Sequence, residues 1–316
     1  MLSNNKNMVE KLKKNILQTV CYYDVLDYPM TIFEVWKYLI CEKGDEIEDG
    51  YSLKEVAEIL TSGELRNFLE NKNGFYFLRG REKLVRQRIA RNKISVLKIK
   101  RMRRWVKIIS MAPFVRMILV TGRLAMKNAQ PQSDWDVLVV LREKRIWIGR
   151  TFVTIFSHIL GKRRYNKKVQ DRLCFNYFIA TDSLEIRNKD LFSANEYFFC
   201  FPLFETRNYF QKFQLRNAWI RNYKPNYYLQ SSDNLFTQKD GKFFRAVRIF
   251  LENLFDHDFL ENYLKKVESR KIKDNPKTKN SSGMIDYDDK ALIFLPNPHG
   301  PEVFEKFKER LEGLGV

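Results

Sequence analysis

Two acidic residues separated by a single residue have the type and spacing to bind a metal ion. Asp134 and Asp136 begin an apolar segment, residues 137–141, whose length and β-branched residues predict a buried strand. Because alternate side chains of a strand share a face, both carboxylates are expected on one side of the sheet and Trp135 on the other. Neighbouring carboxylates repel each other, and a bound divalent cation relieves that repulsion. The pair therefore predicts a metal site.

A glycine turn precedes these acids in the sequence. Residues 117–120 predict another buried strand, and Gly122 follows it directly. Glycine lets the backbone approach a ligand closely, and a helix start over residues 124–128 would offer amide groups to phosphate. A polar turn at residues 130–133 then leads to the acids. The order of strand, glycine turn and paired acids favours a ligand that carries both phosphate and a metal ion.

This arrangement resembles the signature of the polymerase-β-like nucleotidyltransferases: a strand, Gly-Ser, about ten residues, and Asp-x-Asp at the start of the next strand. Here Gly122 and Arg123 are followed by ten residues that end at Ser133, and then by the two acids. The resemblance implies that Asp134 and Asp136 hold Mg²⁺ on a nucleoside triphosphate, which the Gly122 turn, Arg123 and Ser133 contact. Arg123 replaces the family's serine, and its planar cation can hold phosphate without reproducing a compact hydroxyl contact.

The resemblance also implies a third carboxylate on the strand beside the Asp-x-Asp strand. Residues 173–179 predict that strand, but they contain no acid. Asn176 takes an inward position, and Asp171 lies two residues before the strand. Asp171 is therefore the candidate for the third catalytic acid, with an ion pair to the basic residues around it as the alternative. Because the third carboxylate helps to activate the attacking hydroxyl, its displacement favours slow turnover or none.

The composition predicts a globular, strongly basic protein. Its 316 residues are 44% hydrophobic and carry a formal net charge of +19. This excludes a disordered chain and favours an acidic partner, with nucleic acid ahead of an anionic membrane surface. The four cysteines are widely spaced without a C-x-x-C pair, which fits reduced, buried thiols rather than disulfides or a zinc site. The N-terminus lacks a signal peptide's apolar core, and the longest apolar stretch, residues 146–160, is too short to span a bilayer. These features predict a soluble, cytoplasmic protein.

Residues 1–80 are expected to form a winged-helix-like unit. Thr31 and Ser52 are each followed three residues later by glutamate, which predicts two capping boxes. The expected elements are helices at residues 9–23, 32–41 and 53–60, helical turns at 64–70 and a strand at 75–78. The helix at 53–60 is acidic and would read a DNA groove poorly, so packing or protein contact is an equal alternative to nucleic-acid reading.

A basic connecting helix is predicted next. Residues 81–107 contain twelve Lys or Arg residues and one acid. Val85, Ile89, Val96 and residues 102–105 recur at helical spacing and are expected to pack on the protein. The basic face would then be free to contact the phosphates of a nucleic acid, the alternative being a solvated face.

The whole chain is expected to have an α+β fold in four parts. These are the winged-helix-like unit (residues 1–80), the basic connecting helix (81–110), a small mixed-sheet nucleotidyltransferase domain (111–195) and a helical C-terminal region (196–316). Within the last part the patterns predict an amphipathic helix at 243–267, a flexible loop at 271–283, a short strand at 291–295 and a terminal helix at 301–311.

Two functions follow from these expectations. The first is Mg²⁺-dependent transfer of a nucleoside monophosphate from a nucleoside triphosphate to an acceptor hydroxyl on RNA, protein or a small molecule. The alternative is a catalytically idle nucleotidyltransferase fold that serves as a nucleic-acid-binding or regulatory module. The intact acid pair, Asp134 and Asp136, favours the first function, whereas the missing serine and the missing third carboxylate favour the second.

Overall fold

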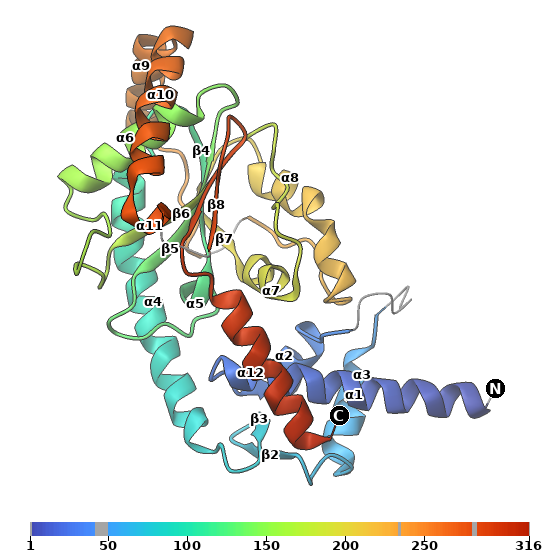
Figure 1. Ribbon diagram of the computed structural model, residues 1–316. Helices are drawn as coiled ribbons and strands as arrows, with labels where there is room; N and C mark the ends of the chain where they lie inside the picture. Colours follow the sequence, from blue (N-terminus) through green and yellow to red (C-terminus); the bar gives the residue numbers. More distant parts are fainter. Residues whose placement is uncertain (1, 42–49, 233–234, 280–282, 316) are drawn as a thin grey trace.

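The computed structural model of the chain describes residues 2–41, 50–232, 235–279 and 283–315. Helix α4 (Lys83–Ile109) runs along the molecule and joins a part built around a six-stranded sheet to a smaller part rich in helices (Figure 1). The expected α+β class with a mixed sheet is confirmed.

The smaller part contains the N-terminal elements. These are α1 (Leu2–Val25), β1 (Met30–Thr31), α2 (Ile32–Lys37), α3 (Leu53–Ser62), β2 (Leu69–Lys72) and β3 (Phe75–Leu78), and the strands pair antiparallel in the order β1-β3-β2. Both expected capping boxes are present, at Thr31 and at Ser52. The helical turns expected at 64–70 are wrong at their end, because Leu69 starts β2 and pairs with Leu78. Helix α2 ends at Lys37, whereas the sequence predicts a helix up to residue 41. The chain beyond the helix places Ile40 in the core.

Helix α4 turns several of its basic side chains inward. Arg88 is buried and its guanidinium lies 3.0 Å from the Glu34 carboxylate, while Arg91 lies 3.5 Å from Asp27. The expected apolar stripe is wrong at Ile89, which is 40% exposed. The reason is that the N-terminal part presents acids to α4, and a buried cation is stable only beside such a partner.

The remaining cations of this segment form an exposed basic face along α4. It consists of Lys83, Arg86, Lys93, Lys100, Arg101, Arg104 and Lys107. These exposed side chains are placed to meet a polyanion, although Arg101 is also paired with Asp171.

The larger sheet has the strand order β7-β4-β5-β6-β9-β8, in which β5 and β6 are parallel and the other neighbours antiparallel. The strands expected from the sequence are confirmed as β4 (Val115–Val120), β5 (Trp135–Leu141), β6 (Leu173–Ala180) and β9 (Ala291–Leu295). Helix α6 (Ile146–Ile159) supplies the crossover that a parallel pair requires. Both faces of the sheet are packed with apolar side chains, which fixes the strand register near the acids.

The C-terminal region is less helical than its sequence predicts. After α7 (Leu191–Phe199), residues Phe201–Glu205 form β7 at one edge of the sheet, and β8 (Met284–Tyr287) forms the opposite edge. This region also contains α8 (Tyr209–Arg216), the 3-10 helix η1 (Ala218–Asn222) and α12 (His299–Leu314). Helix α12 packs against α1. The aromatic segment 201–205 thus pairs with β4 instead of continuing a helix.

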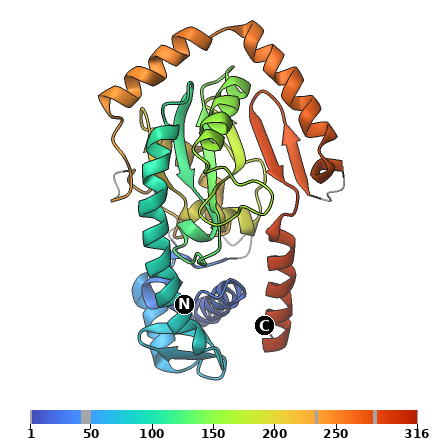
Figure 2. The same cartoon turned by 90° about the vertical axis from the view of Figure 1, so that its left-hand side faces the viewer.

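The long helix expected at 243–267 is instead two helices that form an arch over one end of the sheet (Figure 2). These are α9 (Lys242–Phe255) and α10 (Asp258–Asp274), and Asp256 lies at the corner, where it accepts hydrogen bonds from Arg142 and Arg145. The prediction of a flexible loop at 271–283 is wrong up to residue 279, because α10 continues to Asp274 and α11 (Pro276–Lys279) follows. Residues 280–282 lie outside the described chain.

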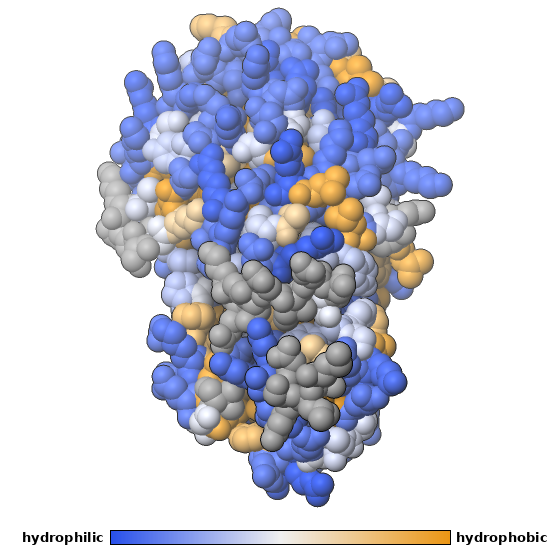
Figure 3. Space-filling view, turned by 90° about the vertical axis from the view of Figure 1, so that its right-hand side faces the viewer, coloured by the Kyte–Doolittle hydropathy of each residue, from blue (hydrophilic) through white to orange (hydrophobic). Residues whose placement is uncertain are grey.

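Hydrophilic side chains cover most of one face of the molecule, with hydrophobic groups in separate patches (Figure 3). Across the described residues, every helix is too short or too polar to cross a membrane.

A lysine is fully buried where the two parts meet. The Lys224 ammonium group donates hydrogen bonds to the Tyr23 hydroxyl and the Tyr38 carbonyl, both at 3.1 Å. Burial lowers the pKa of Lys224 from its usual 10.5 to about 7. This interface therefore depends on a side chain that ionises near neutral pH.

We expect the free energy of unfolding to rise with pH above about 7 more steeply in the natural protein than in Lys224→Met. Up to pH 10.5 the unfolded chain keeps the Lys224 proton that the folded chain has released, so a higher pH favours folding. The difference should approach about 1.4 kcal/mol per pH unit in that window. Urea unfolding of both proteins at pH 7, 8 and 9 measures it, and parallel pH profiles would contradict the assignment.

Candidate metal and nucleotide site

The turn after β4 brings the backbone against an acid of the site. Gly122 has a φ of +63°, and a Cβ at this position would lie 2.8 Å from the Oδ2 atom of Asp136. The amide of Thr121 donates a 3.1 Å hydrogen bond to the Asp136 carbonyl, which holds the turn against β5. Helix α5 (Gly122–Ala125) is a single turn, shorter than the helix expected at 124–128. Only glycine satisfies both the backbone conformation and the lack of space here.

Three potential metal ligands converge beside this turn. One carboxylate oxygen each from Asp134 and Asp136, together with the Cys174 sulfur, lie within 4.8 Å of one another. Trp135 between the two acids is fully buried, as the expected alternation requires. Cys174 comes from β6, where it pairs in register with Asp136. The structure thus brings together the two acids selected from the sequence and adds a thiol.

A bulge in β6 turns one more polar side chain toward the acids. The register with β5 shifts after Val137, which leaves Asn176 as an extra residue between Phe175 and Tyr177. The Asn176 amide donates to Asp136 Oδ1 at 2.9 Å, and the Cys174 thiol donates to the Asn176 side-chain carbonyl at 2.9 Å. Asn176 therefore orients two of the three potential ligands, in the inward position that the sequence predicts.

An arginine from the segment after α6 lies over this cluster. Nη1 of Arg164 donates to Asp134 Oδ2 at 2.6 Å and to the Cys174 sulfur at 3.4 Å. The Arg164 side chain is 46% exposed, so it reaches the acids from the solvent side. A positive group therefore already lies between two of the converging donors.

A further carboxylate lies close to the cluster, and the sequence analysis did not select it. Glu196, on α7, is hydrogen-bonded by the Thr121 hydroxyl, and burial raises its pKa to about 7. Its charge also raises the pKa of Asp136. The sequence does distinguish Glu196, because it is the only acid within the aromatic, apolar helix Leu191–Phe199. An acid in such a segment is costly to bury without a role.

The electrostatics of the cluster favour a bound cation. Burial, followed by the charges of Asp134 and Glu196, raises the pKa of Asp136 to about 8, although Arg164 and Asn176 oppose the shift. Burial and then the charges of the two aspartates raise the pKa of the Cys174 thiol to about 12. Burial is the larger cause of both shifts and the neighbouring carboxylates add to it, so a divalent cation held here would stabilise the ionised ligands.

Two other residues selected from the sequence are placed differently. Arg123 follows the glycine turn but is exposed to solvent. The Ser133 hydroxyl donates to the Gln130 carbonyl at 2.8 Å, and its own carbonyl accepts a hydrogen bond from Lys98. Ser133 therefore closes the polar turn before the acids, and the side chain of Arg123 is exposed to solvent.

Asp171 lies outside the cluster of converging ligands. Its Oδ1 atom is 2.7 Å from the Lys98 ammonium group, and its Oδ2 atom is 3.1 Å from the Arg101 guanidinium group. Both carboxylate oxygens are thus engaged in ion pairs with α4. Of the two interpretations of Asp171, this geometry favours the ion pair.

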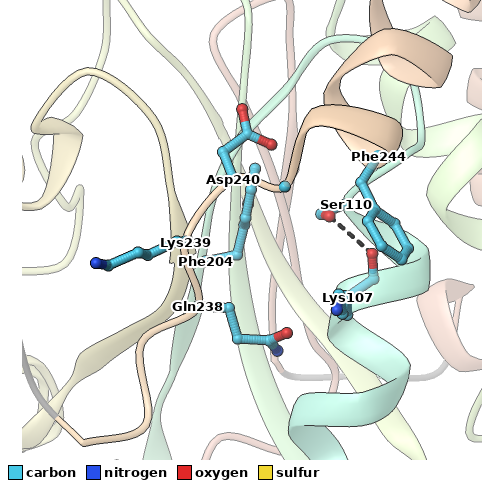
Figure 4. A pocket seen from close by; sticks show the side chains of 8 residues that line it. Lys107, Ser110, Phe204, Gln238, Lys239, Asp240 and Phe244 are labelled. Atoms are coloured by element: carbon cyan, nitrogen blue, oxygen red, sulfur yellow. Dashed lines mark hydrogen bonds between the residues drawn. The ribbon is translucent and has the colours of Figure 1, made fainter.

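A surface pocket elsewhere offers less chemistry (Figure 4). It is lined by Lys107, Ser110, Phe204, Gln238, Lys239, Asp240, Gly241 and Phe244. The Ser110 hydroxyl donates to the Lys107 carbonyl at 2.8 Å, and the Gln238 amide donates to the Arg103 carbonyl. These two polar side chains are therefore satisfied within the protein, whereas the acid cluster brings three potential metal ligands together and is the stronger candidate for chemistry.

Comparisons of the chain with protein-family models, with curated proteins and with solved structures gave no match.

Proposed function

We propose that this protein is a metal-dependent nucleotidyltransferase that transfers a nucleoside monophosphate from a nucleoside triphosphate to an acceptor hydroxyl. The observation that carries the proposal is the contact between Gly122 and Asp136. A backbone turn without a side chain lies directly against one of two converging carboxylates. Metal and phosphate must approach each other closely in such a reaction, and a glycine turn lets the backbone approach both.

Each residue of the site has a role in this reaction. Asp134 and Asp136 would hold the metal, which would neutralise charge on the triphosphate. Arg164 is exposed enough to leave Asp134 and pair with a phosphate, for which a guanidinium group has the matching geometry. Asn176 holds Asp136 in the orientation that metal binding requires.

The acceptor hydroxyl needs a group that removes its proton. The oxygen attacks the α-phosphorus, the bond to the β-phosphate oxygen breaks, and pyrophosphate leaves. Glu196 is the candidate base, because its carboxylate is held by Thr121 beside the acids and its pKa is about 7. Asp171, with both oxygens in ion pairs, is less suited to this task. The exposed basic face of α4 is available to an acceptor that carries phosphates.

The test of the proposal is calorimetric titration of the protein with each of ATP, GTP, CTP and UTP, in the presence of Mg²⁺ and then of Co²⁺. Asp134→Asn and Asp136→Asn should each weaken metal-dependent binding at least tenfold, on the order of 1.4 kcal/mol or more. Asp182→Asn, which changes an exposed acid in the turn after β6, is the matched control and should bind like the natural protein. Equal affinity in all four proteins would remove the acid pair from nucleotide binding.

The alternative function is a nucleotide-binding fold without turnover, for which the lack of an acid on β6 and the Arg164–Asp134 ion pair are the supporting observations. A transfer assay with labelled nucleotide separates the two functions. Label transferred to RNA or to protein supports the enzyme. Mg²⁺-dependent binding without transfer to RNA, protein or small hydroxyl compounds supports the idle fold.

A further inference from the structure

We propose that Cys174 is the third protein ligand of the metal bound by Asp134 and Asp136, and that this thiol makes the site select a thiophilic divalent cation such as Zn²⁺ or Co²⁺ over Mg²⁺. The inference rests on the metal position of the proposed function, but it does not require nucleotide transfer.

The position of Cys174 in the sheet is the first argument. It pairs in register with Asp136 on the neighbouring parallel strand, so both side chains project from the same face of the sheet. The β6 strand provides no carboxylate, and Cys174 is the residue of β6 whose side chain joins the two acids. A thiol thus stands where a further metal ligand is expected to come from this strand.

The distances are the second argument. The three donor atoms lie within 4.8 Å of one another. Zinc binds a thiolate at about 2.3 Å and a carboxylate oxygen at about 2.0 to 2.2 Å in tetrahedral geometry, so two donors on one ion lie roughly 3.5 Å apart. Donor atoms that lie within 4.8 Å of one another therefore need to move by about 1 Å, which rotation of the side chains supplies.

The surroundings of the thiol are the third argument. Arg164 places a positive group within hydrogen-bond distance of both Asp134 and Cys174, so this half-exposed side chain takes the position between the two donors that a metal ion would take. Asn176 contacts the other two, since it donates to Asp136 and accepts from the Cys174 thiol. Such a partner fixes the orientation of metal ligands. The neighbouring carboxylate of Glu196 adds negative charge that a divalent cation balances.

The donor set then determines the metal. Mg²⁺ prefers oxygen ligands and seldom takes a thiolate, whereas Zn²⁺ and Co²⁺ accept sulfur and oxygen together. Three protein ligands also leave at least one coordination position open, which is the arrangement of a catalytic rather than a structural zinc site. The open position is where a phosphate oxygen would bind.

The test uses Co²⁺, because a cobalt–thiolate bond gives a near-ultraviolet charge-transfer absorption and the ion also absorbs weakly in the visible range. We expect the natural protein to show the charge-transfer band on titration with Co²⁺, and Cys174→Ser to lose it. Cys200→Ser, which changes another buried thiol whose sulfur donates to the Tyr197 carbonyl, should keep it. Asp134→Asn should weaken Co²⁺ binding, because the band must arise at the acid pair.

A second variant at the same position tests whether loss of the band in Cys174→Ser results from misfolding. Cys174→Asp supplies an oxygen ligand at the same position, so it should bind metal without the band, and Mg²⁺ should displace Co²⁺ at least tenfold more readily than in the natural protein. Visible absorption without the charge-transfer band in the natural protein would overturn the role of Cys174 and leave the acid pair as a metal site. A band that appears in Asp134→Asn at the same Co²⁺ concentrations as in the natural protein would place the cobalt away from the acids and also overturn the proposal.

Discussion

Gly122→Ala should weaken Mg²⁺-triphosphate binding at least tenfold and destabilise the fold by about 1 to 3 kcal/mol, the usual cost of a strained backbone conformation. The residue has a φ of +63°, which an alanine adopts only with strain. Its new methyl group would also lie 2.8 Å from Asp136 Oδ2 and would push that carboxylate away from the position it shares with Asp134 and Cys174. Misplacement of one metal ligand lowers the affinity for metal and nucleotide together.

Gly80→Ala is the matched control for this variant. Gly80 also has a positive φ, of +76°, but its added Cβ would meet no atom within 4 Å. Both variants should lose similar backbone stability, measured by urea unfolding, and only Gly122→Ala should lose nucleotide affinity, measured by calorimetry. Equal nucleotide affinity in the two variants would show that the close contact with Asp136 has no part in binding.

Asp171→Asn should destabilise the protein by about 3 to 5 kcal/mol, the range for breaking a buried ion pair from one side. The Lys98 side chain is only 3% exposed, and Asp171 is its charged partner at 2.7 Å. Asparagine keeps the shape of the side chain and tolerates the φ of +53° at this position, so the variant removes the charge alone. Urea unfolding at pH 7 measures the loss.

Two further variants isolate the buried pair. Arg101→Gln removes the other partner of Asp171, whose side chain is 63% exposed, and should cost less than about 1 kcal/mol. Lys98→Met combined with Asp171→Asn should recover part of the stability, because no buried charge is then left without a partner. If Asp171→Asn were as stable as the natural protein and lost only transfer activity, a catalytic role for Asp171 would be restored.

Local sequence signals were sufficient for the elements that position the acids. The apolar runs at residues 117–120 and 137–141 predict β4 and β5, and the spacing of Thr31 and Ser52 from their glutamates predicts both capping boxes. These signals are local, because strand alternation and helix capping depend on neighbours within a few residues. The placement of Asp134 and Asp136 on one side followed from the same alternation.

The rest of the site depends on contacts between distant segments. Glu196 is far from Asp136 in sequence and reaches it only because α7 packs beside the glycine turn. Cys174 carries no motif of its own, and its role depends on the register between β5 and β6. The hydrophobic periodicity of a single sequence does not specify which strands become neighbours. Tertiary packing therefore decides where Glu196 and Cys174 lie.

The predictions for the basic segment and for the C-terminal region were wrong for a similar reason. Arg88 and Lys98 look like surface cations in a helical pattern, and only the acids of other segments, Glu34 and Asp171, make their burial favourable. The helix expected at 243–267 has continuous helical spacing, but Asp256 bonds to Arg142 and Arg145 and takes the corner. In each case an ion pair with a distant residue overrides the local pattern.

The buried cations of α4 connect the N-terminal part of the molecule to the turn that precedes Asp134. One end is fixed to the N-terminal part through Arg88 and Glu34, and Lys98 is bonded to the Ser133 carbonyl, one residue before Asp134. Ten residues of helix separate the two attachments by about 15 Å. A tilt of about 5° about the first attachment would thus displace the turn before the acids by about 1 Å, a misplacement that can cost an enzyme about a hundredfold in rate. A partner that binds the N-terminal part would therefore shift the acid pair without touching it.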